Sequence, residues 1–336
     1  MVGIGAFLSL TDAGGKAHRD VYAEALSLAR EAERLGCDAV WINEHHFMGF
    51  SICPDSLVMA SALLAQSSKI RVGNAVSLIP LQNPLSIAER VAMLDNISGG
   101  RFDLGLGRGG YPLDAMVFGR PLDQFNTAMD EGIAFIHQAL SSPYVTAPHV
   151  PPVQIYPRPF TQPHPPILVA GQGESTMRIA AERGLSLLLS WHQNHTEREA
   201  VVRRYAVLAT APTHHVGSAC VYIADSRAQA EAEFAPKFRD WLRTGRSGVF
   251  DRAVDDPRLA ELLKFADAKA ATEDAVVAKL MANNPIGRVE DVVAWFREDI
   301  ARTGTQRYAV FCDIIGDPVR ARANLTRLMT QVVPAL

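Results

Sequence analysis

The stretch Cys37–Phe47, C-D-A-V-W-I-N-E-H-H-F, joins an apolar run to a dense polar cluster. Its first half, Asp38–Ile42, predicts a buried strand. Its second half, Asn43–Phe47, places a carboxylate and two imidazoles directly after that strand. Parallel α/β barrels carry their reactive groups on the loops that follow the carboxyl ends of the strands. The stretch therefore predicts a barrel strand and a candidate active site, with a pair of surface histidines on a loop as the plainer alternative.

Strands and helices alternate on both sides of this stretch. The preceding segment Val2–Leu10 predicts a strand, and a helical apolar stripe covers Asp20–Leu35. Six further strands are expected at Ile70–Ile79, Phe102–Leu106, Ile167–Ala170, Leu185–Ser190, Val216–Ala224 and Arg307–Ile314. Eight β-α units with mostly short connections predict a closed (β/α)8 TIM barrel. A doubly wound open sheet is the alternative, because the sequence does not show the order of the strands.

The remaining helices are expected between and after these strands, at Pro54–Ser67, Pro84–Ser98, Leu122–Leu140, Ser175–Arg183, Glu197–Leu208, Arg227–Leu242, Val289–Arg302 and Pro318–Val333. The alternation breaks at two places. The Pro-rich segment Ala147–Pro166 predicts a long loop or hairpin. The segment Thr244–Pro285 predicts an insertion before the eighth strand, which is either a solvated excursion or a lid over the active site. We expect residues 1–336 to form a single domain.

The composition bounds the class of protein. The chain has 336 residues, is 48% hydrophobic and carries a formal net charge of −3, which gives no electrostatic footprint for nucleic acid or anionic lipid. No apolar run is long enough to span a membrane, and the N-terminus shows no signal peptide. The four cysteines, Cys37, Cys53, Cys220 and Cys312, are far apart and form no C-x-x-C motif. We therefore expect reduced thiols and a cytoplasmic protein that binds neither nucleic acid nor membrane.

Gly105–Gly110, G-L-G-R-G-G, matches the dinucleotide pattern G-x-G-x-x-G. The match follows the fourth strand and runs into Tyr111 and Pro112, so it does not open the long helix that a dinucleotide-binding unit needs. The glycines still allow a ligand to approach the backbone, and Arg108 can pair with a phosphate. The alternative is a glycine-rich turn whose arginine lies on the surface.

Ala170–Thr176, A-G-Q-G-E-S-T, is a second candidate for anion binding. It follows the fifth strand and opens a helix, whose free N–H groups and dipole favour a phosphate. The alternative is an ordinary Ser or Thr helix cap. Two phosphate candidates at strand ends favour one nucleotide-like cofactor in the barrel mouth. We expect no metal site, because the adjacent His45 and His46 point to opposite faces of a strand and no H-x-x-x-H motif is present.

Several segments together resemble the flavin-dependent luciferase-like monooxygenases. The resemblance lies in W-I-N-E-H-H-F (Trp41–Phe47), V-G-N-A-V-S-L-I-P (Val72–Pro80) and the stretch Ala88–Gly109. Two later segments, Gly184–Trp191 and Asn284–Asp291, agree in the same order, so the resemblance covers almost the whole chain. It is strongest to the catalytic alpha subunit of bacterial luciferase.

The resemblance implies a barrel that binds reduced FMN supplied by a separate NAD(P)H:flavin reductase. It implies that O2 reacts through a peroxyflavin to oxygenate a small organic substrate, with His45 as the catalytic histidine and Glu44 orienting it. Arg108 matches the phosphate-binding arginine, and Ala75-Val76 matches a cis peptide beneath the flavin ring. The other cofactor-binding residues that it implies are Gly107, Tyr111, Val169, Ala170, Gly171, Gly173, Ser175, Thr176 and Trp191. The helices at residues 54–67 and 84–98 match a subunit interface, which implies a homodimer.

Two residues depart from the family pattern. Gly107 stands where the luciferase alpha subunit has a reactive cysteine, so no thiol chemistry is implied. Asn126 stands where that subunit has a second phosphate-binding arginine. Loss of one charged contact weakens FMN binding by about 1.5–3 kcal/mol, and Arg120 is a candidate to compensate.

The substrate is the least determined part of this interpretation. Basic residues are mostly arginine, which is typical of a GC-rich genome. This favours the tailoring of a secondary metabolite, as in antibiotic biosynthesis, over oxidation of a long-chain aldehyde with emission of light. A deazaflavin-dependent hydride-transfer enzyme and a non-catalytic flavin-binding subunit are the further alternatives.

Overall fold

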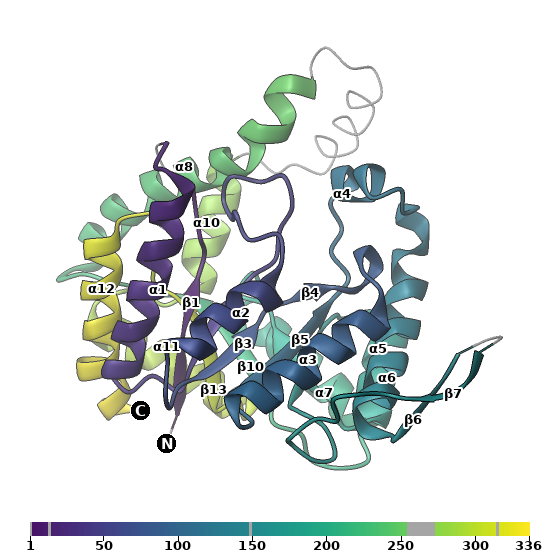
Figure 1. Cartoon of the computed structure of the whole chain (residues 1–336). Coiled ribbons are helices and arrows are strands. Elements are labelled where there is room, and N and C mark those ends of the chain that lie inside the picture. Colours follow the sequence, from purple (N-terminus) through teal and green to yellow (C-terminus); the bar gives the residue numbers. More distant parts are fainter. Residues whose placement is uncertain (1, 13–14, 148–149, 254–272, 314–315) are drawn as a thin grey trace.

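Eight parallel strands form a closed barrel in the computed structural model, which describes residues 2–12, 15–147, 150–253, 273–313 and 316–336 (Figure 1). The strands are β1 (Gly3–Leu8), β2 (Ala39–Ile42), β3 (Arg71–Asn74), β5 (Phe102–Gly107), β8 (Ile167–Ala170), β9 (Ser186–Leu189), β10 (Val216–Cys220) and β13 (Arg307–Phe311). Each strand pairs with the next in this order, and β13 pairs with β1, which closes the circle. The predicted TIM barrel is confirmed, and the open-sheet alternative is wrong.

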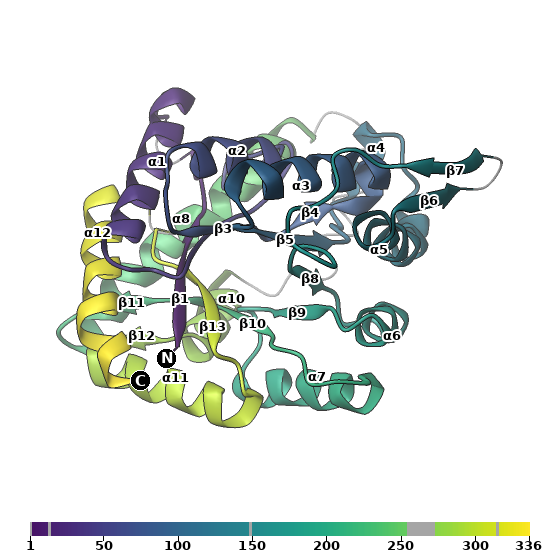
Figure 2. The ribbon, with the colours of Figure 1, turned by 60° about the horizontal axis from the view of Figure 1, so that its bottom comes forward.

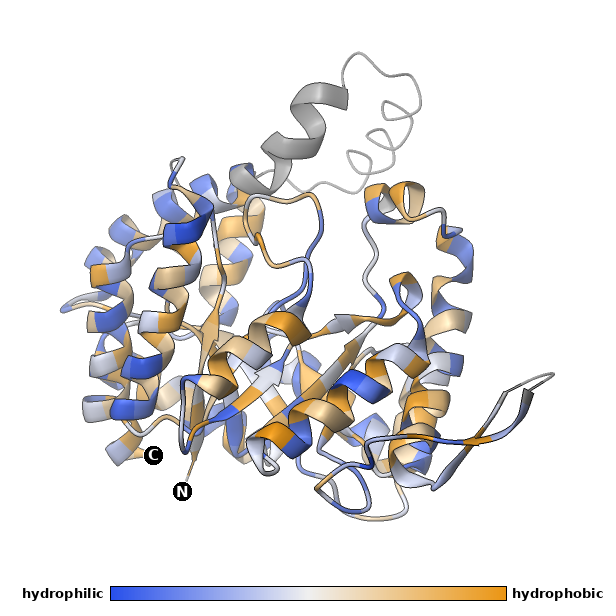
Figure 3. Ribbon diagram, viewed as in Figure 1, coloured by the Kyte–Doolittle hydropathy of each residue, from blue (hydrophilic) through white to orange (hydrophobic). Residues whose placement is uncertain are grey.

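Helices surround the barrel on its outside (Figure 2). They are α1 (His18–Arg34), α2 (Ser56–Ala65), α3 (Pro84–Ser98), α5 (Phe125–Ser141), α6 (Glu174–Glu182), α7 (His195–Leu208), α8 (Arg227–Ala253), α11 (Val289–Thr303) and α12 (Pro318–Arg327). Apolar stripes hold them against the strands: in α1, for example, Val21, Ala25, Leu28 and Ala32 are buried. Figure 3 shows the resulting separation of hydrophobic strands from hydrophilic outer surfaces. No described helix is both long and apolar enough to cross a membrane.

Two predicted strands are shorter than expected because the chain leaves the barrel ladder. The range Ile70–Ile79 contains β3, the short strand β4 (Ser77–Leu78) and the start of a 3-10 turn, η1 (Ile79–Leu81). The Asn74 side chain exchanges hydrogen bonds with the backbone of Gly105, at 2.8 and 3.1 Å, where a continuous strand would pair. The range Val216–Ala224 contains β10 and β11 (Tyr222–Ile223), and β11 pairs with β12 (Ile286–Gly287) outside the barrel.

The helix expected at Leu122–Leu140 begins later than predicted. A short helix, α4 (Pro112–Val117), and a 3-10 turn, η2 (Leu122–Gln124), precede α5. The Pro-rich segment Ala147–Pro166 is partly hairpin and partly loop. Its first part contains β7 (Val150–Gln154), which forms an antiparallel pair with β6 (Tyr144–Ala147) and projects from the barrel in Figure 1, whereas residues 155–166 form neither helix nor strand.

The insertion before the eighth barrel strand is described only at its two ends. Helix α8 continues beyond the expected Leu242 to Ala253, and α10 (Glu273–Asn283) leads back towards the barrel. The prediction that Thr244–Pro285 forms a lid depends largely on residues 254–272, which lie outside the described part of the chain.

The amino-terminal part of the barrel interior is filled by side chains. The buried carboxylate of Asp103 pairs with Arg71 and Arg307, and the Arg307 guanidinium lies 5.9 Å from the Trp41 ring centroid. The Trp41 indole occupies the space beside two glycines: a Cβ atom at Gly5 or Gly73 would lie 2.4 or 2.3 Å from it. Space for a ligand is therefore left at the carboxyl ends of the strands.

Candidate active site

A cavity of about 480 Å³ opens at the carboxyl ends of the barrel strands. It is lined by Phe7, Asn43, His45, Met48, Phe50, Ala75, Val76, Tyr111, Ala170, Leu188, Ser190, Trp191, His192, Ser218, Trp241, Leu242 and Phe311. These residues come from most of the barrel strands and from the loops that follow them. The cavity thus lies where the stretch Cys37–Phe47 predicted it.

His45 reaches this cavity from the loop after β2. Its backbone N–H donates to the Cys53 carbonyl oxygen at 3.0 Å, and its ring lies 4.6 Å from the ring of Phe50 and 5.9 Å from that of Tyr111. Burial, followed by the neighbouring His46, lowers the pKa of His45 to about 4. The imidazole is therefore neutral at pH 7, and one ring nitrogen can donate a proton while the other accepts one.

His46 lies on the loop after β2 and does not line the cavity that His45 lines. Its ring packs against Phe118 at 4.8 Å, and its buried Nε2 has no hydrogen-bond partner. The described residues contain no group of three or more His, Cys, Asp or Glu side chains arranged to hold a metal ion.

Among the described residues, no hydrogen bond joins the Glu44 side chain to His45, so the orienting role expected for Glu44 stays a prediction. Its buried carboxylate accepts four hydrogen bonds, from the N–H and hydroxyl of Ser56, the N–H of Leu78 and the amide of Gln82, at 2.7–3.0 Å. Burial raises the pKa of Glu44. Glu44 thus fastens the loop after β2, which carries His45, to the start of α2 and to the segment around β4.

The segment between β3 and β4 forms an apolar floor. The Ala75–Val76 peptide bond is cis, as predicted, and both side chains line the cavity together with Ala170 and Leu188. A Cβ atom at Gly107 would lie 2.0 Å from Cγ2 of Val76. A side chain at position 107 would therefore require Val76 to move.

The two predicted phosphate-binding segments lie side by side. Gly107 of β5 is paired in register with Ala170 of β8, so Arg108 and Gly171 follow neighbouring strand ends. The Arg108 side chain is exposed, and its Nη1 donates to Oδ1 of Asn126 at 3.1 Å. Among the described residues Arg108 has no acidic partner. Asn126, the residue at which the sequence departs from the family pattern, thus accepts a hydrogen bond from Arg108.

The start of α6 completes this polar region. Its cap residue Gly173 provides no side-chain cap for the N–H groups of the first turn. Ser175 is exposed, but Thr176 is buried and its hydroxyl donates to Oδ1 of Asp130 at 2.6 Å. Within the described ranges no hydrogen bond engages the Ser175 hydroxyl, so it and the first-turn N–H groups can bind an anion, whereas the Thr176 hydroxyl is engaged.

Most of the other predicted site residues fall at or beside the cavity. Tyr111 and Trp191 line it as expected, whereas the Val169 side chain packs into the core between strands and helices, because it alternates with the inward-facing Ala170. Arg120 is exposed in the segment after α4. Several further residues line the cavity but were not predicted from the sequence, namely Phe7, Asn43, Met48, Phe50, Leu188, Ser190, His192, Ser218, Trp241, Leu242 and Phe311.

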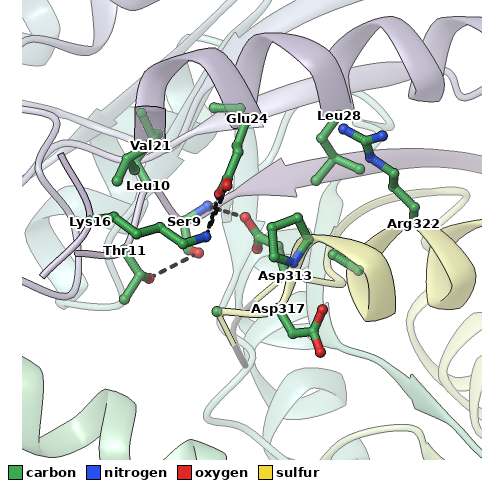
Figure 4. A pocket seen from close by; sticks show the side chains of 14 residues that line it. Ser9, Leu10, Thr11, Lys16, Val21, Glu24, Leu28, Asp313, Asp317 and Arg322 are labelled. Carbon is green, nitrogen blue, oxygen red and sulfur yellow. Dashed lines mark hydrogen bonds and ion pairs between the residues drawn. The ribbon is translucent and has the colours of Figure 1, made fainter. Parts of the chain in front are cut away.

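A second, much smaller cavity of about 50 Å³ lies outside the barrel, where β1, α1 and α12 approach one another (Figure 4). The Asp313 carboxylate accepts a hydrogen bond from the Ser9 N–H at 2.9 Å, and Lys16 pairs with Glu24 at 2.8 Å. This space suffices for one or two water molecules, and no predicted site residue lines it.

Comparison with known proteins gives a consistent family. A family model described as luciferase-like monooxygenase matches residues 4–307. The alkanal monooxygenase alpha chain of the Kryptophanaron alfredi symbiont is 25% identical over 334 residues, which cover 95% of this chain and 94% of that one. The monooxygenase RslO1 from Streptomyces bottropensis superimposes with a TM-score of 0.83 at 22% identity, covering 99% of both chains. The oxygenating constituent of 3,6-diketocamphane monooxygenase from Pseudomonas putida, solved with FMN, gives 0.74 at 20% identity, covering 99% of this chain and 98% of that one.

Proposed function

The chain belongs to the luciferase-like monooxygenase family, and on this premise we propose that it is the oxygenating component of a two-component, FMN-dependent monooxygenase. In this proposal a separate NAD(P)H:flavin reductase supplies reduced FMN, and O2 and a small organic substrate are the other reactants. The observation that carries the proposal is the register of β5 and β8, which sets Arg108 and the start of α6 beside a cavity that contains His45.

The residues present fit FMN. A phosphate needs positive charge and free donors, and Arg108, the Ser175 hydroxyl and the first-turn N–H groups of α6 supply them. The isoalloxazine ring needs an apolar surface, and Ala75, Val76, Ala170 and Leu188 provide one. No carboxylate lines the described cavity. Bound in this way, reduced FMN would supply the electrons that reduce O2 and place one of its oxygen atoms in the substrate.

The protein's own groups bind, exclude water and move protons. Aromatic side chains of the cavity, among them Tyr111 and Trp191, keep water from the reacting centre. The neutral imidazole of His45 can take a proton at one ring nitrogen and return it later. Glu44 acts indirectly, because its hydrogen bonds fix the loop that carries His45.

Substitution of Arg108 tests the cofactor assignment. Removal of one charged contact to the phosphate should weaken FMN binding about 10- to 100-fold in a fluorescence titration of Arg108→Ala. Arg19→Ala removes a distant arginine that is 90% exposed and should leave the affinity unchanged. Equal affinity of Arg108→Ala and the unaltered protein for FMN would reject the phosphate assignment. Tighter binding of the deazaflavin F420 than of FMN would favour the hydride-transfer alternative.

We also propose a homodimer through α2 and α3. Both helices expose large apolar side chains, with Val58 67%, Met93 51% and Ile97 58% exposed, although one apolar face of each helix is already buried against the barrel. Exposed apolar residues gathered on neighbouring helices are typical of an interface between subunits, and a two-fold axis would bury the same surface on both copies. The tailoring of a secondary metabolite remains part of the proposal and rests on composition alone.

A further inference from the structure

Asn43 places an amide at the wall of the cavity, directly after β2. Its side chain lines the cavity together with that of His45, whereas the carboxylate of Glu44, between them in the sequence, hydrogen-bonds to Ser56 at the start of α2. Trp41, two positions before Asn43, fills the barrel interior. Asn43 therefore continues the row of β2 side chains that face into the barrel.

One end of the Asn43 amide is held by the protein. Asn43 is 6% exposed, and its Oδ1 atom accepts a hydrogen bond from the buried hydroxyl of Ser51 at 2.8 Å. Its Nδ2 atom carries two N–H donors and has no hydrogen-bond partner among the described residues, yet it is not closed off from solvent as the unpartnered Nε2 atom of His46 is. Because Asn43 borders the cavity, a ligand bound there can accept a hydrogen bond from Nδ2.

The wall of the cavity favours a neutral ligand. No Asp, Glu, Lys or Arg lines it among the described residues. Burial lowers the pKa of both lining histidines, to about 4 for His45, with that of His192 shifted in the same direction. Since a charge buried without a partner is strongly unfavourable, the part of a ligand enclosed here should be neutral.

A ligand that covers Asn43 also needs an acceptor. Once the cavity is filled, water no longer reaches Nδ2, and a buried donor without a partner costs free energy. A carbonyl oxygen accepts a hydrogen bond without bringing a charge, whereas an alkyl chain offers no acceptor. A neutral carbonyl group therefore meets both requirements of this wall.

We propose that Asn43 is a ligand-binding residue whose Nδ2 donates a hydrogen bond to a neutral carbonyl oxygen in the cavity that His45 lines. The inference rests on the proposed function, because two reactants of that reaction can supply the oxygen. The isoalloxazine ring of FMN carries two carbonyl groups, and the organic substrate can be a ketone or a related carbonyl compound. In both cases the hydrogen bond would fix the position of the carbonyl group relative to His45.

Asn43→Leu tests the hydrogen bond, because leucine is of similar size and has no donor, and two titrations distinguish the two sources. Fluorescence measures the affinity for FMN. Calorimetry on the FMN-saturated protein compares 2-acetylnaphthalene with 2-isopropenylnaphthalene, in which a CH2 group replaces the ketone oxygen. If the flavin supplies the oxygen, Asn43→Leu should bind FMN about tenfold more weakly and leave the ratio of the two naphthalene affinities unchanged. If the substrate supplies it, the affinity for FMN should stay within about twofold, and a preference of about tenfold for the ketone should be lost.

Two control variants accompany Asn43→Leu. Phe50→Leu removes an aromatic ring of the wall that carries no donor, so it should weaken both naphthalenes without changing their ratio. Ser51→Ala removes the hydroxyl that holds Oδ1 of Asn43 and leaves the donor in place, so it should weaken the same carbonyl ligand by about threefold. If Asn43→Leu does not fold, Ser51→Ala takes its place, and unchanged titrations would then reject the inference.

Three results would overturn the inference. Asn43→Leu could keep the unaltered protein's affinity for FMN and for both naphthalenes, it could lose both naphthalenes equally without any change in FMN binding, or the anion 2-naphthoate could bind more tightly than the ketone. The proposed function fails separately. If FMN does not bind to the unaltered protein, the FMN-dependent reaction is rejected, and the naphthalene titrations without FMN decide whether Asn43 binds a carbonyl oxygen.

Discussion

Replacement of Asp114 by asparagine should remove a pH dependence of stability that lies next to the active site. Asp114 belongs to α4, the short helix that follows Tyr111, and it is 1% exposed. Neither carboxylate oxygen has a hydrogen-bond partner in the part of the chain that the structure describes. Burial raises the pKa of Asp114 from the ordinary 3.8 to about 6, because an isolated carboxylate is poorly solvated there.

The sign and size of the effect follow from linkage. Between the two pKa values the native protein keeps a proton that the unfolded chain has lost, so the free energy of unfolding falls as the pH rises. A difference of about two pKa units corresponds to about 3 kcal/mol in total, of which about 1.4 kcal/mol is lost between pH 5 and pH 8. The asparagine side chain does not ionise and has no such dependence.

Urea denaturation at pH 5, 6, 7 and 8 measures this difference. The free energy of unfolding of Asp114→Asn minus that of the unaltered protein should rise by about 1.4 kcal/mol across the range. Comparison of the slopes cancels the cost of burying the amide, which is the same at each pH. Asp123→Asn, at an exposed position in η2, serves as the control and should show a flat difference. A flat difference for Asp114→Asn as well would refute the reasoning.

Three further predictions concern the floor and the surface of the barrel. Glu44→Ala leaves the donors of four hydrogen bonds without an acceptor and should lower the free energy of unfolding by about 2–4 kcal/mol in urea denaturation. Glu89→Ala, at an exposed position, should lower it by less than about 0.5 kcal/mol. Gly107→Ala should lower the melting temperature because its Cβ would lie 2.0 Å from Cγ2 of Val76. The added substitution Val76→Ala should restore the melting temperature, and a double variant that melts as low as Gly107→Ala would contradict the packing argument. Met93→Glu should turn the proposed dimer into a monomer by light scattering, and a monomeric unaltered protein at micromolar concentration would reject the interface.

The sequence predicted the barrel because its strands are buried on both faces and read as apolar runs separated by helical stripes. The strand ends were less predictable. Asn74 ends β3 because its side chain hydrogen-bonds to the backbone of Gly105, thirty-one positions later in the chain. A local sequence pattern does not show that the side chain of one residue will take the backbone hydrogen bonds that a neighbouring strand would otherwise make. The same limit explains the late departure of β11 towards β12, which depends on a pairing between distant segments.

Residues at strand ends were predicted well where a motif covers them. His45, the Ala75–Val76 pair, Tyr111, Ala170 and Trp191 all line the cavity. A motif does not show the long-range contacts of its residues, and Glu44 is an example. Its neighbour in sequence is His45, but its hydrogen-bond partners are Ser56, Leu78 and Gln82. The partners of Glu44 lie 12, 34 and 38 positions away in the chain, so proximity in sequence to His45 did not indicate them.

Several aromatic rings of the cavity lie outside the segments that carry the resemblance. Trp191 lies within one of these segments, as do most residues of the floor and the phosphate region, whereas Phe7, Phe50, Trp241 and Phe311 lie in none of them. A site that binds a common cofactor must preserve one geometry, while the surface facing a variable substrate is free to change. The aromatic part of the lining, to which β1, the loop after β2, α8 and β13 contribute, is therefore where the substrate specificity of this chain should lie.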